Sequence, residues 1–285
     1  MSELWMRKVK KSKALAGYFH NGLPYNRVGC GPRVLVIFQG LVFENKPLSA
    51  QMAWLYNGYY EYLEEDYTTY IVLRKPGLPV GYSMQNMADD YATMIKEEFG
   101  GPVDVIGVST GGSIAHHFAA DHPELVRKLI IHSSAYTLSD ATKKAMNHIG
   151  HLARQRQWRA AYTILASPTH SEAKQYPRLV VWIGALLAGI FGAPDDPSDL
   201  LVTIEAEDKF NFKNRLAQIT SPTLVVAGDR DQFYPEALFR ETAEGIPNAR
   251  LILYKGMGHP AGGKQFHQDV LAFLKEGNDA RDYNH

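Results

Sequence analysis

A serine surrounded by glycines is the feature of this sequence that most directly suggests chemistry. Residues 103–112 read VDVIGVSTGG, so Ser109 follows a strand-like run and precedes a helix-like one. A serine at such a tight turn adopts an unfavourable backbone conformation, and Gly107 and Gly111 remove the side chains that would collide there. The hydroxyl then stands at the first turn of a helix, where free N–H groups favour negative charge. This context predicts a nucleophilic serine; the alternative is a glycine-rich turn that only packs a helix on a sheet.

The partners that a serine nucleophile needs follow later in the chain. Its hydroxyl requires a base at neutral pH, and a carboxylate must hold that base in one tautomer. Residues 223–231 read TLVVAGDRD and residues 251–259 read LILYKGMGH, so Asp229, Asp231 and His259 lie where strand-like runs end. Because the carboxyl ends of parallel strands meet at one edge of a sheet, their loops can bring these groups within ~3 Å of each other. The sequence therefore predicts a serine, histidine and aspartate site at that edge.

Alternating strand-like and helix-like segments surround these residues. A hairpin is predicted around the turn dipeptide Asn21-Gly22. A helix beginning near Ser83 carries methionines at helical spacing, which we interpret as core packing. Such alternation indicates an α/β fold with a mostly parallel central sheet flanked by helices. The later strands are predicted at residues 33–40, 68–73, 103–107, 126–134, 221–231 and 249–260, with an aromatic, helix-like segment at 50–65.

The alternation stops between residues 136 and 215. This segment contains helical patterns, above all over residues 139–165, and no convincing strand. A helical block inserted between two halves of a sheet is expected to cap the carboxyl edge, where open α/β sheets bind ligands. We therefore predict a core of residues 1–135 and 216–285, with a helical cap of residues 136–215 inserted into it.

The glycine-flanked Ser109, the later acid and histidine, and the helical insertion together resemble the α/β-hydrolase fold superfamily. The resemblance covers most of the chain, although the cap matches only as a helical insertion. In this family the acid commonly stands at the fourth place of a G-x-x-D stretch, which is residues 228–231 here and favours Asp231. The resemblance thus implies a triad of Ser109, Asp231 and His259, with Asp229 as a turn or capping residue.

An oxyanion hole is the second feature that the resemblance implies. Acyl transfer places negative charge on the former carbonyl oxygen, and two preorganised N–H donors can stabilise it. The backbone N–H of Thr110, directly after the nucleophile, is one expected donor, and the backbone N–H of Leu41 is the other. Relatives often have His-Gly in the second loop, whereas this chain has Gln39-Gly40. Because the donors are main-chain groups, this change is compatible with an oxyanion hole.

The expected substrate pocket draws on several segments. Gln39, Val42 and His132 lie at the predicted sheet edge, and Trp182 lies in an apolar run of the cap at residues 179–193. That run is too short to span a bilayer, so no stable membrane insertion is expected. Its apolar residues favour a small apolar substrate. The alternatives are that they seat the cap on the core or form a homodimer through the cap.

Two polar features near the site are interpreted as structural. The loop after the second predicted parallel strand reads RKPGLP at residues 74–79, where relatives place an acidic residue and glycines. We interpret it as a rigid turn, with anion binding by Arg74 or Lys75 as the alternative. His116 and His117, on the helix after the serine, are interpreted as packing or surface residues.

Composition excludes several classes of function. Lysine plus arginine equals aspartate plus glutamate at 30 each, so nothing suggests a nucleic-acid partner. The single cysteine, Cys30, can form neither an internal disulfide nor a cysteine-rich metal site. The G-x-G-x-x-G spacing of dinucleotide-binding proteins is absent, and the basic N-terminus lacks the apolar core of a secretory signal. We expect a cytoplasmic protein without metal or cofactor that binds a small molecule.

The leading hypothesis is a serine hydrolase that cleaves a carboxylic ester, lactone or thioester of a small, apolar substrate through an acyl-enzyme. A carbon–carbon bond hydrolase, a perhydrolase or a lyase would have the same triad. The alternative from another class is a non-catalytic ligand-binding protein on the hydrolase fold, because fold carries reaction class but not substrate.

Overall fold

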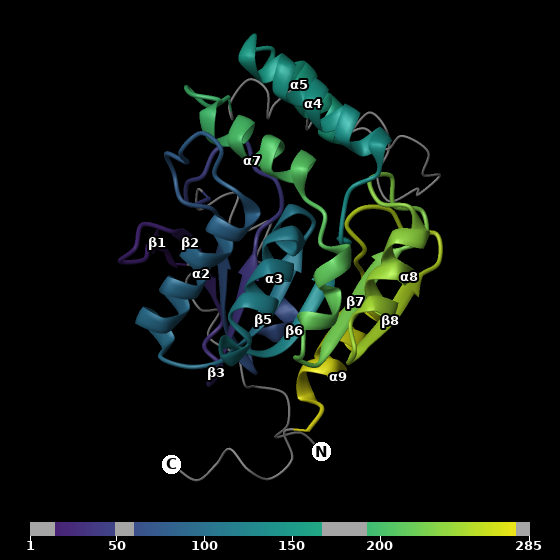
Figure 1. Ribbon diagram of the computed structural model, residues 1–285. Helices are drawn as coiled ribbons and strands as arrows, with labels where there is room; N and C mark the ends of the chain where they lie inside the picture. The colour runs from purple at the N-terminus through teal and green to yellow at the C-terminus, as the bar shows by residue number, and fades with distance from the viewer. Residues whose placement is uncertain (1–14, 49–59, 167–192, 278–285) are drawn as a thin grey trace, which may run out of the picture.

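The structure is a computed structural model that describes residues 15–48, 60–166 and 193–277. A sheet lies at its centre (Figure 1). Its eight strands have the order β1-β2-β4-β3-β5-β6-β7-β8. All pairs from β4 to β8 are parallel, whereas β1–β2 and β2–β4 are antiparallel. The strands are β1 (Leu15–Tyr18), β2 (Pro24–Val28), β3 (Arg33–Phe38), β4 (Tyr67–Val72), β5 (Val103–Val108), β6 (Val126–His132), β7 (Thr223–Gly228) and β8 (Ala249–Tyr254). The predicted α/β fold and mostly parallel sheet are confirmed.

The N-terminal hairpin forms around the predicted turn. Strands β1 and β2 pair so that Tyr18 faces Pro24. Between them Gly22 has a φ of +90°, which glycine reaches without a clash of a Cβ atom. The N–H of Gly22 donates to the carbonyl of Phe19 at 2.9 Å and closes the turn. The dipeptide Asn21-Gly22 therefore correctly predicts the hairpin.

Helices cover both faces of the sheet, and the strand residues alternate between them. Val36 and Phe38 of β3 pack with one cluster of buried side chains, whereas Leu35 and Ile37 pack with the other. This is the two-residue period of a strand buried on both faces. The first face is covered by α2 (Met84–Phe99), α3 (Thr110–Asp121) and α8 (Glu236–Gly245), the second by α9 (Lys264–Lys275) and η1 (Glu61–Leu63).

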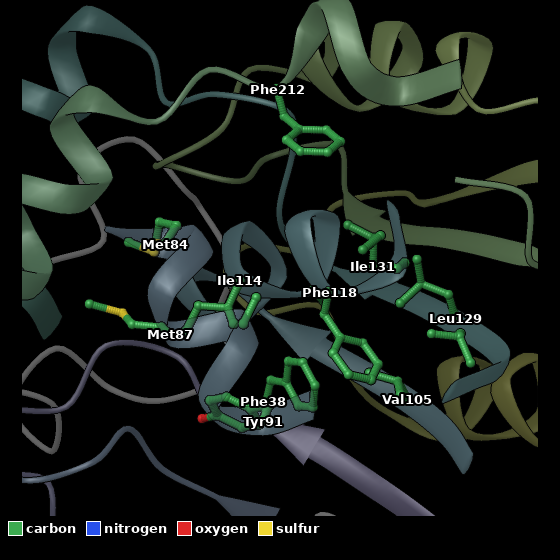
Figure 2. Close-up of a cluster of buried hydrophobic side chains, with 14 of the residues drawn as sticks. Phe38, Met84, Met87, Tyr91, Val105, Ile114, Phe118, Leu129, Ile131 and Phe212 are labelled. Carbon is green, nitrogen blue, oxygen red and sulfur yellow. The ribbon is translucent and has the colours of Figure 1, made fainter. Parts of the chain in front are cut away.

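The methionines of α2 belong to the core, as predicted. Ser83 caps this helix: its hydroxyl accepts the N–H of Asn86, whose side chain accepts the N–H of Ser83 in return. Met84 and Met87 are buried, and Figure 2 shows them on the same cluster as Tyr91 from the next turn. The side chains of Phe38, Ile114 and Phe118 complete this part of the core between α2, α3 and the sheet.

Between β6 and β7 the described residues form helices α4 (Asp140–Arg154), α5 (Trp158–Ala166) and α7 (Ser198–Lys209). These helices lie together above one end of the sheet in Figure 1. A bridge between Thr137 and Asn211 joins the two ends of the insertion. The helix η3 (Lys213–Gln218) crosses the boundary predicted at residue 215.

Phe43, from the loop after β3, packs among the helices of the insertion together with Ile149, Trp158 and Leu200. The side chain of Phe43 therefore packs the insertion against the core, close to the predicted oxyanion loop. Most of the predicted helical segment at 50–65 and of the apolar run at 179–193 lies outside the described residues. None of the helices in the described ranges combines the length and the apolar character of a membrane-spanning segment.

Candidate active site

Ser109 occupies the turn between β5 and α3. Its φ is +51°, a conformation that side-chain-bearing residues rarely adopt. The turn is close to the neighbouring strand: a Cβ atom at Gly111 would lie 1.9 Å from the carbonyl oxygen of Phe38. A Cβ atom at Gly107 would lie 2.7 Å from the Cβ atom of Ala115. Both glycines are thus required by the close approach of strand, turn and helix, as the sequence pattern predicts.

The side chains of Ser109, His259 and Asp231 form one hydrogen-bonded chain. Nε2 of His259 lies 3.0 Å from Oγ of Ser109, and Nδ1 of His259 lies 2.7 Å from Oδ2 of Asp231. His259 lies in the loop between β8 and α9, and Asp231 lies in the loop after β7. Three loops distant in the sequence therefore meet at the carboxyl edge of the sheet. The carboxylate fixes the proton on Nδ1 of His259, which leaves Nε2 free to accept the proton of the serine.

The backbone holds the carboxylate of Asp231 in place. Its second oxygen, Oδ1, accepts the N–H groups of Phe233 at 2.8 Å and Tyr234 at 3.1 Å. The Asp231 side chain is fully buried, so these donors and His259 replace its lost hydration. Oδ1 of Asp229 instead accepts the N–H of Gly256 at 2.6 Å, a hydrogen bond that links the loop after β7 to the loop after β8. The structure thus places Asp231 on the histidine and Asp229 in the turn.

Backbone N–H groups without an acceptor gather beside Ser109. Among the described residues, none accepts the N–H of Gly40, Leu41 or Thr110. Thr110 is the first residue of α3, where no intrahelical acceptor exists. Gly40 lies against Ser109, since a Cβ atom at Gly40 would be 3.3 Å from the Cβ atom of Ser109. The donors expected at Thr110 and Leu41 thus have no acceptor in the described part of the chain, and both residues line the same cavity as Ser109.

A cavity of about 410 Å³ opens at Ser109. Its size is in the range of small-molecule sites. The catalytic candidates Ser109 and His259 lie in its wall, and the other described lining residues are mostly apolar. Those apolar or aromatic side chains are Leu41, Tyr60, Val108, Leu138, Met146, Leu165, Phe233, Tyr234 and Pro260. The insertion forms part of the cavity wall, because the lining includes Met146 of α4, Leu165 of α5 and Leu138, which lies just before α4.

Of the other residues predicted to line the substrate pocket, only some line the cavity in the described part of the chain. Gln39 lines the cavity, as expected. Val42 is not among the described lining residues, and Trp182 lies outside the described part of the chain. His132 is also absent from the lining, because it is buried below the site. Its Nε2 donates to the carbonyl of Ala261 at 2.7 Å and its ring stacks on Phe266, so it supports the loop that carries His259.

Burial makes His116 and His132 poor proton acceptors. Both are fully buried, and desolvation lowers the pKa of each to about 4. His116 also donates through Nδ1 to the carbonyl of Gly112 at 2.7 Å, which agrees with its predicted packing role. In the unfolded chain both side chains titrate near pH 6.5.

Acid is therefore expected to destabilise the protein through these two histidines. Below pH 6.5 the unfolded state binds protons that the folded state does not, so stability is lost as the pH falls toward 4. Each contributes a loss of ~2 kcal/mol between pH 7 and pH 5. Denaturant unfolding at the two pH values measures this loss, and the variant His132→Asn should lose ~2 kcal/mol less than the wild type. An equal loss in both proteins would contradict the neutral state of His132.

Sequence reasoning missed a buried carboxyl group in the cavity wall. Glu207 of α7 lines the cavity, and its Oε1 accepts the hydroxyl of Ser113 at 2.5 Å. Burial raises the pKa of Glu207, and burial likewise raises that of the Tyr234 phenol nearby. Nothing in the sequence distinguishes Glu207 from Glu205 and Asp208 in the same helix. Its place in the cavity wall depends on which side of α7 faces α3.

No group of three or more His, Cys, Asp and Glu residues that could hold a metal ion occurs in the ranges that the structure describes. Cys30 is exposed.

Comparison with known proteins identifies the family. The model of the alpha/beta hydrolase family matches residues 19–271. RutD of Klebsiella pneumoniae (strain 342), which is named for carbamate hydrolysis, is 25% identical over 185 residues, covering 64% of this chain and 68% of its own. The 2-hydroxy-6-oxononadienedioate/2-hydroxy-6-oxononatrienedioate hydrolase of a Pseudomonas species is 23% identical over 281 residues, covering 90% and 93%.

Solved structures agree on the fold. The alpha/beta hydrolase enzyme MGS-M2, from a Medee basin deep-sea metagenome library, superposes with a TM-score of 0.76 over 92% of this chain and 98% of its own, at 18% identity. Because the family model spans most of the sequence, this chain belongs to the alpha/beta hydrolase family, and it is a hydrolase.

Proposed function

We propose that the protein hydrolyses an ester-type bond of a small, apolar substrate through an acyl-enzyme on Ser109. The observation that carries this proposal is the continuous hydrogen-bonded chain from Oγ of Ser109 through His259 to Asp231. Beside it lie backbone N–H groups that no described residue accepts. A carboxylic ester, a lactone and a thioester all present the carbonyl that such a site attacks.

In the first half of the reaction, Nε2 of His259 accepts the proton of Ser109 while Oγ bonds to the carbonyl carbon of the substrate. The carbonyl oxygen becomes an oxyanion, which the N–H groups of Thr110 and Leu41 stabilise. Asp231 stabilises the imidazolium that forms. His259 then gives its proton to the departing alcohol or thiol as the carbon–leaving-group bond breaks, and the acyl group remains on Ser109.

Water completes the cycle by the reverse proton path. His259 accepts a proton from water, whose oxygen attacks the acyl carbon and again produces an oxyanion at the same donors. The carbon–Oγ bond then breaks, His259 returns the proton to Ser109, and a carboxylic acid leaves. The apolar wall of the cavity favours an apolar acyl or alcohol group.

Cleavage of a carbon–carbon bond is the second candidate. The Pseudomonas relative that aligns over 90% of this chain is named for the hydrolysis of an oxo-dienedioate, which is a carbon–carbon bond reaction. Its substrate carries two carboxylates, and the described cavity wall presents no lysine or arginine to pair with them. The mostly apolar lining that the structure describes supports an apolar ester over a dianionic substrate.

A panel of p-nitrophenyl esters of increasing acyl length, run beside a vinylogous 1,5-diketone with and without carboxylates, separates these candidates. We expect release of p-nitrophenol and a carboxylic acid with short or medium apolar acyl groups, at a kcat/KM well above that for the diketones. Preferential turnover of a dianionic diketone would replace the ester proposal by the carbon–carbon one. No turnover of either class would refute both.

A further inference from the structure

Arg74 is a buried cation close to the oxyanion loop. It follows β4, and only 1% of its surface is exposed. No ion pair joins it to a carboxylate in the described part of the chain, although the more distant Glu207 and Asp199 attract it. Arg74 therefore cannot be the solvent-accessible anion site that was one alternative from the sequence. Its neighbour Lys75 pairs with Asp90 at 2.7 Å.

Instead of a carboxylate, the guanidinium binds two consecutive carbonyl groups. Nη1 donates to the carbonyl oxygen of Gln39 at 3.0 Å, and Nη2 donates to that of Gly40 at 3.1 Å. Burying a cation without a counter-ion is costly, and a side chain that only filled this space could be apolar. The planar fork of an arginine is, however, suited to hold two acceptors in a fixed arrangement.

These two hydrogen bonds determine where the N–H groups of the loop point. The only cis peptide bond in the described ranges is His259–Pro260, so the peptide groups joining Gln39 to Gly40 and Gly40 to Leu41 are trans. In a trans peptide the N–H points away from the C=O. With both carbonyls on Arg74, the N–H groups of Gly40 and Leu41 point away from the guanidinium.

The cavity borders the same loop, and Arg74 is not among its described lining residues. Gln39, Gly40 and Leu41 line it together with Ser109, and the N–H groups of Gly40 and Leu41 have no acceptor among the described residues. A positive charge at the oxygen end of a peptide group also polarises it, which strengthens the N–H as a donor. Orientation and polarisation thus act in the same direction.

We propose that Arg74 is a positioning residue for oxyanion stabilisation, which it achieves by holding the carbonyls of Gln39 and Gly40 so that the N–H of Leu41 faces the oxyanion. This inference rests on the proposed function. Arg74 touches no reacting atom, and it acts entirely through the loop. Its removal should therefore weaken binding of the transition state more than binding of the substrate.

The test compares wild type, Arg74→Met, Arg74→Lys and the control Lys75→Met, each checked for a folded state by its unfolding midpoint. For each protein, kcat and KM are measured with the best p-nitrophenyl ester. The inhibition constant of phenylboronic acid, which forms a tetrahedral anionic adduct on a serine, is measured together with that of the product acid. Arg74→Met should lower kcat about 100-fold to 1,000-fold, the effect of losing one oxyanion donor, with a change in KM of less than about threefold.

The boronate measurement separates positioning from general distortion. Boronate affinity should fall about 100-fold in Arg74→Met, while the affinity for the product acid stays nearly unchanged. Arg74→Lys should lose less boronate affinity than Arg74→Met, because the ammonium remains a charged donor. It should still lose some, because one ammonium cannot bind two carbonyls as the planar guanidinium does. Lys75→Met should match the wild type. Arg74→Lys also provides the test if Arg74→Met does not fold.

The outcomes distinguish this inference from the proposed function. Folded Arg74 variants with wild-type kcat and boronate affinity would overturn the positioning role alone. Equal losses in boronate, product and substrate binding would also overturn it, since they indicate a merely structural residue. A wild type that neither hydrolyses the esters nor binds the boronate at Ser109 would overturn the proposed function, and this inference with it.

Discussion

Replacing Ser109 by alanine is expected to lower kcat for the best ester substrate by about 10,000-fold or more. The variant lacks the hydroxyl oxygen that lies 3.0 Å from Nε2 of His259, and no acyl-enzyme can form. Loss of the nucleophile in such sites leaves only the catalysis that binding and oxyanion donors provide. Steady-state kinetics with p-nitrophenyl esters and release of the carboxylic acid measure the effect.

The alanine variant should remain folded. Alanine retains the Cβ atom of serine and therefore adds no strain at the φ of +51°. The Ser109 side chain is also not the cap of α3, because it forms no capping hydrogen bond there. An unchanged unfolding midpoint and an unchanged affinity for the product acid are the controls. Substantial residual hydrolysis by a folded Ser109→Ala would show that the reaction uses another group.

Replacing Asp231 by asparagine should lower kcat by about 10,000-fold at neutral pH. The carboxylate accepts the proton of Nδ1 at 2.7 Å, whereas an amide group can donate to Nδ1 and so place the imidazole proton on Nε2. The ring then cannot accept the serine proton, and the imidazolium loses its counter-charge. Asparagine still offers Oδ1 to the N–H groups of Phe233 and Tyr234, so the loop should keep its conformation.

Asp229 provides the matched control for this prediction. It lies two residues earlier in the same loop, but its Oδ1 accepts the N–H of Gly256 and not a group of the reaction. Asp229→Asn should change kcat by no more than about tenfold, through small shifts of the loop. A large loss of kcat in Asp229→Asn, together with nearly full activity in Asp231→Asn, would contradict the assignment of Asp231 and would identify Asp229 as the acid.

The positions of Ser109, Asp231 and His259 were predictable because each follows a strand with an unmistakable pattern. Short β-rich runs separated by helices require a parallel sheet, and a parallel sheet brings the loops after its strands to one edge. The glycines around Ser109 identify the turn, since only they tolerate the close approach of Phe38 and Ala115. Local sequence therefore carried enough information for the sheet and for this part of the site.

The cavity wall was harder to predict because it depends on tertiary packing. His132 ends a strand beside the site, but its ring turns below the sheet edge onto Phe266 and the Ala261 carbonyl. Glu207 reaches Ser113 from a helix far along the chain. Arg74 looks like an ordinary surface cation in the sequence, and only the fold buries it against the carbonyl groups of Gln39 and Gly40. None of these placements follows from spacing along the chain.

Covalent labelling with a fluorophosphonate, located by mass spectrometry of the digested protein, tests most directly whether Ser109 is an activated nucleophile. The site predicts one adduct per chain on the peptide that contains Ser109, formed rapidly by the wild type, slowly by Asp231→Asn and not by Ser109→Ala. An unlabelled wild type, or a label on another residue that persists in Ser109→Ala, would contradict the proposed mechanism.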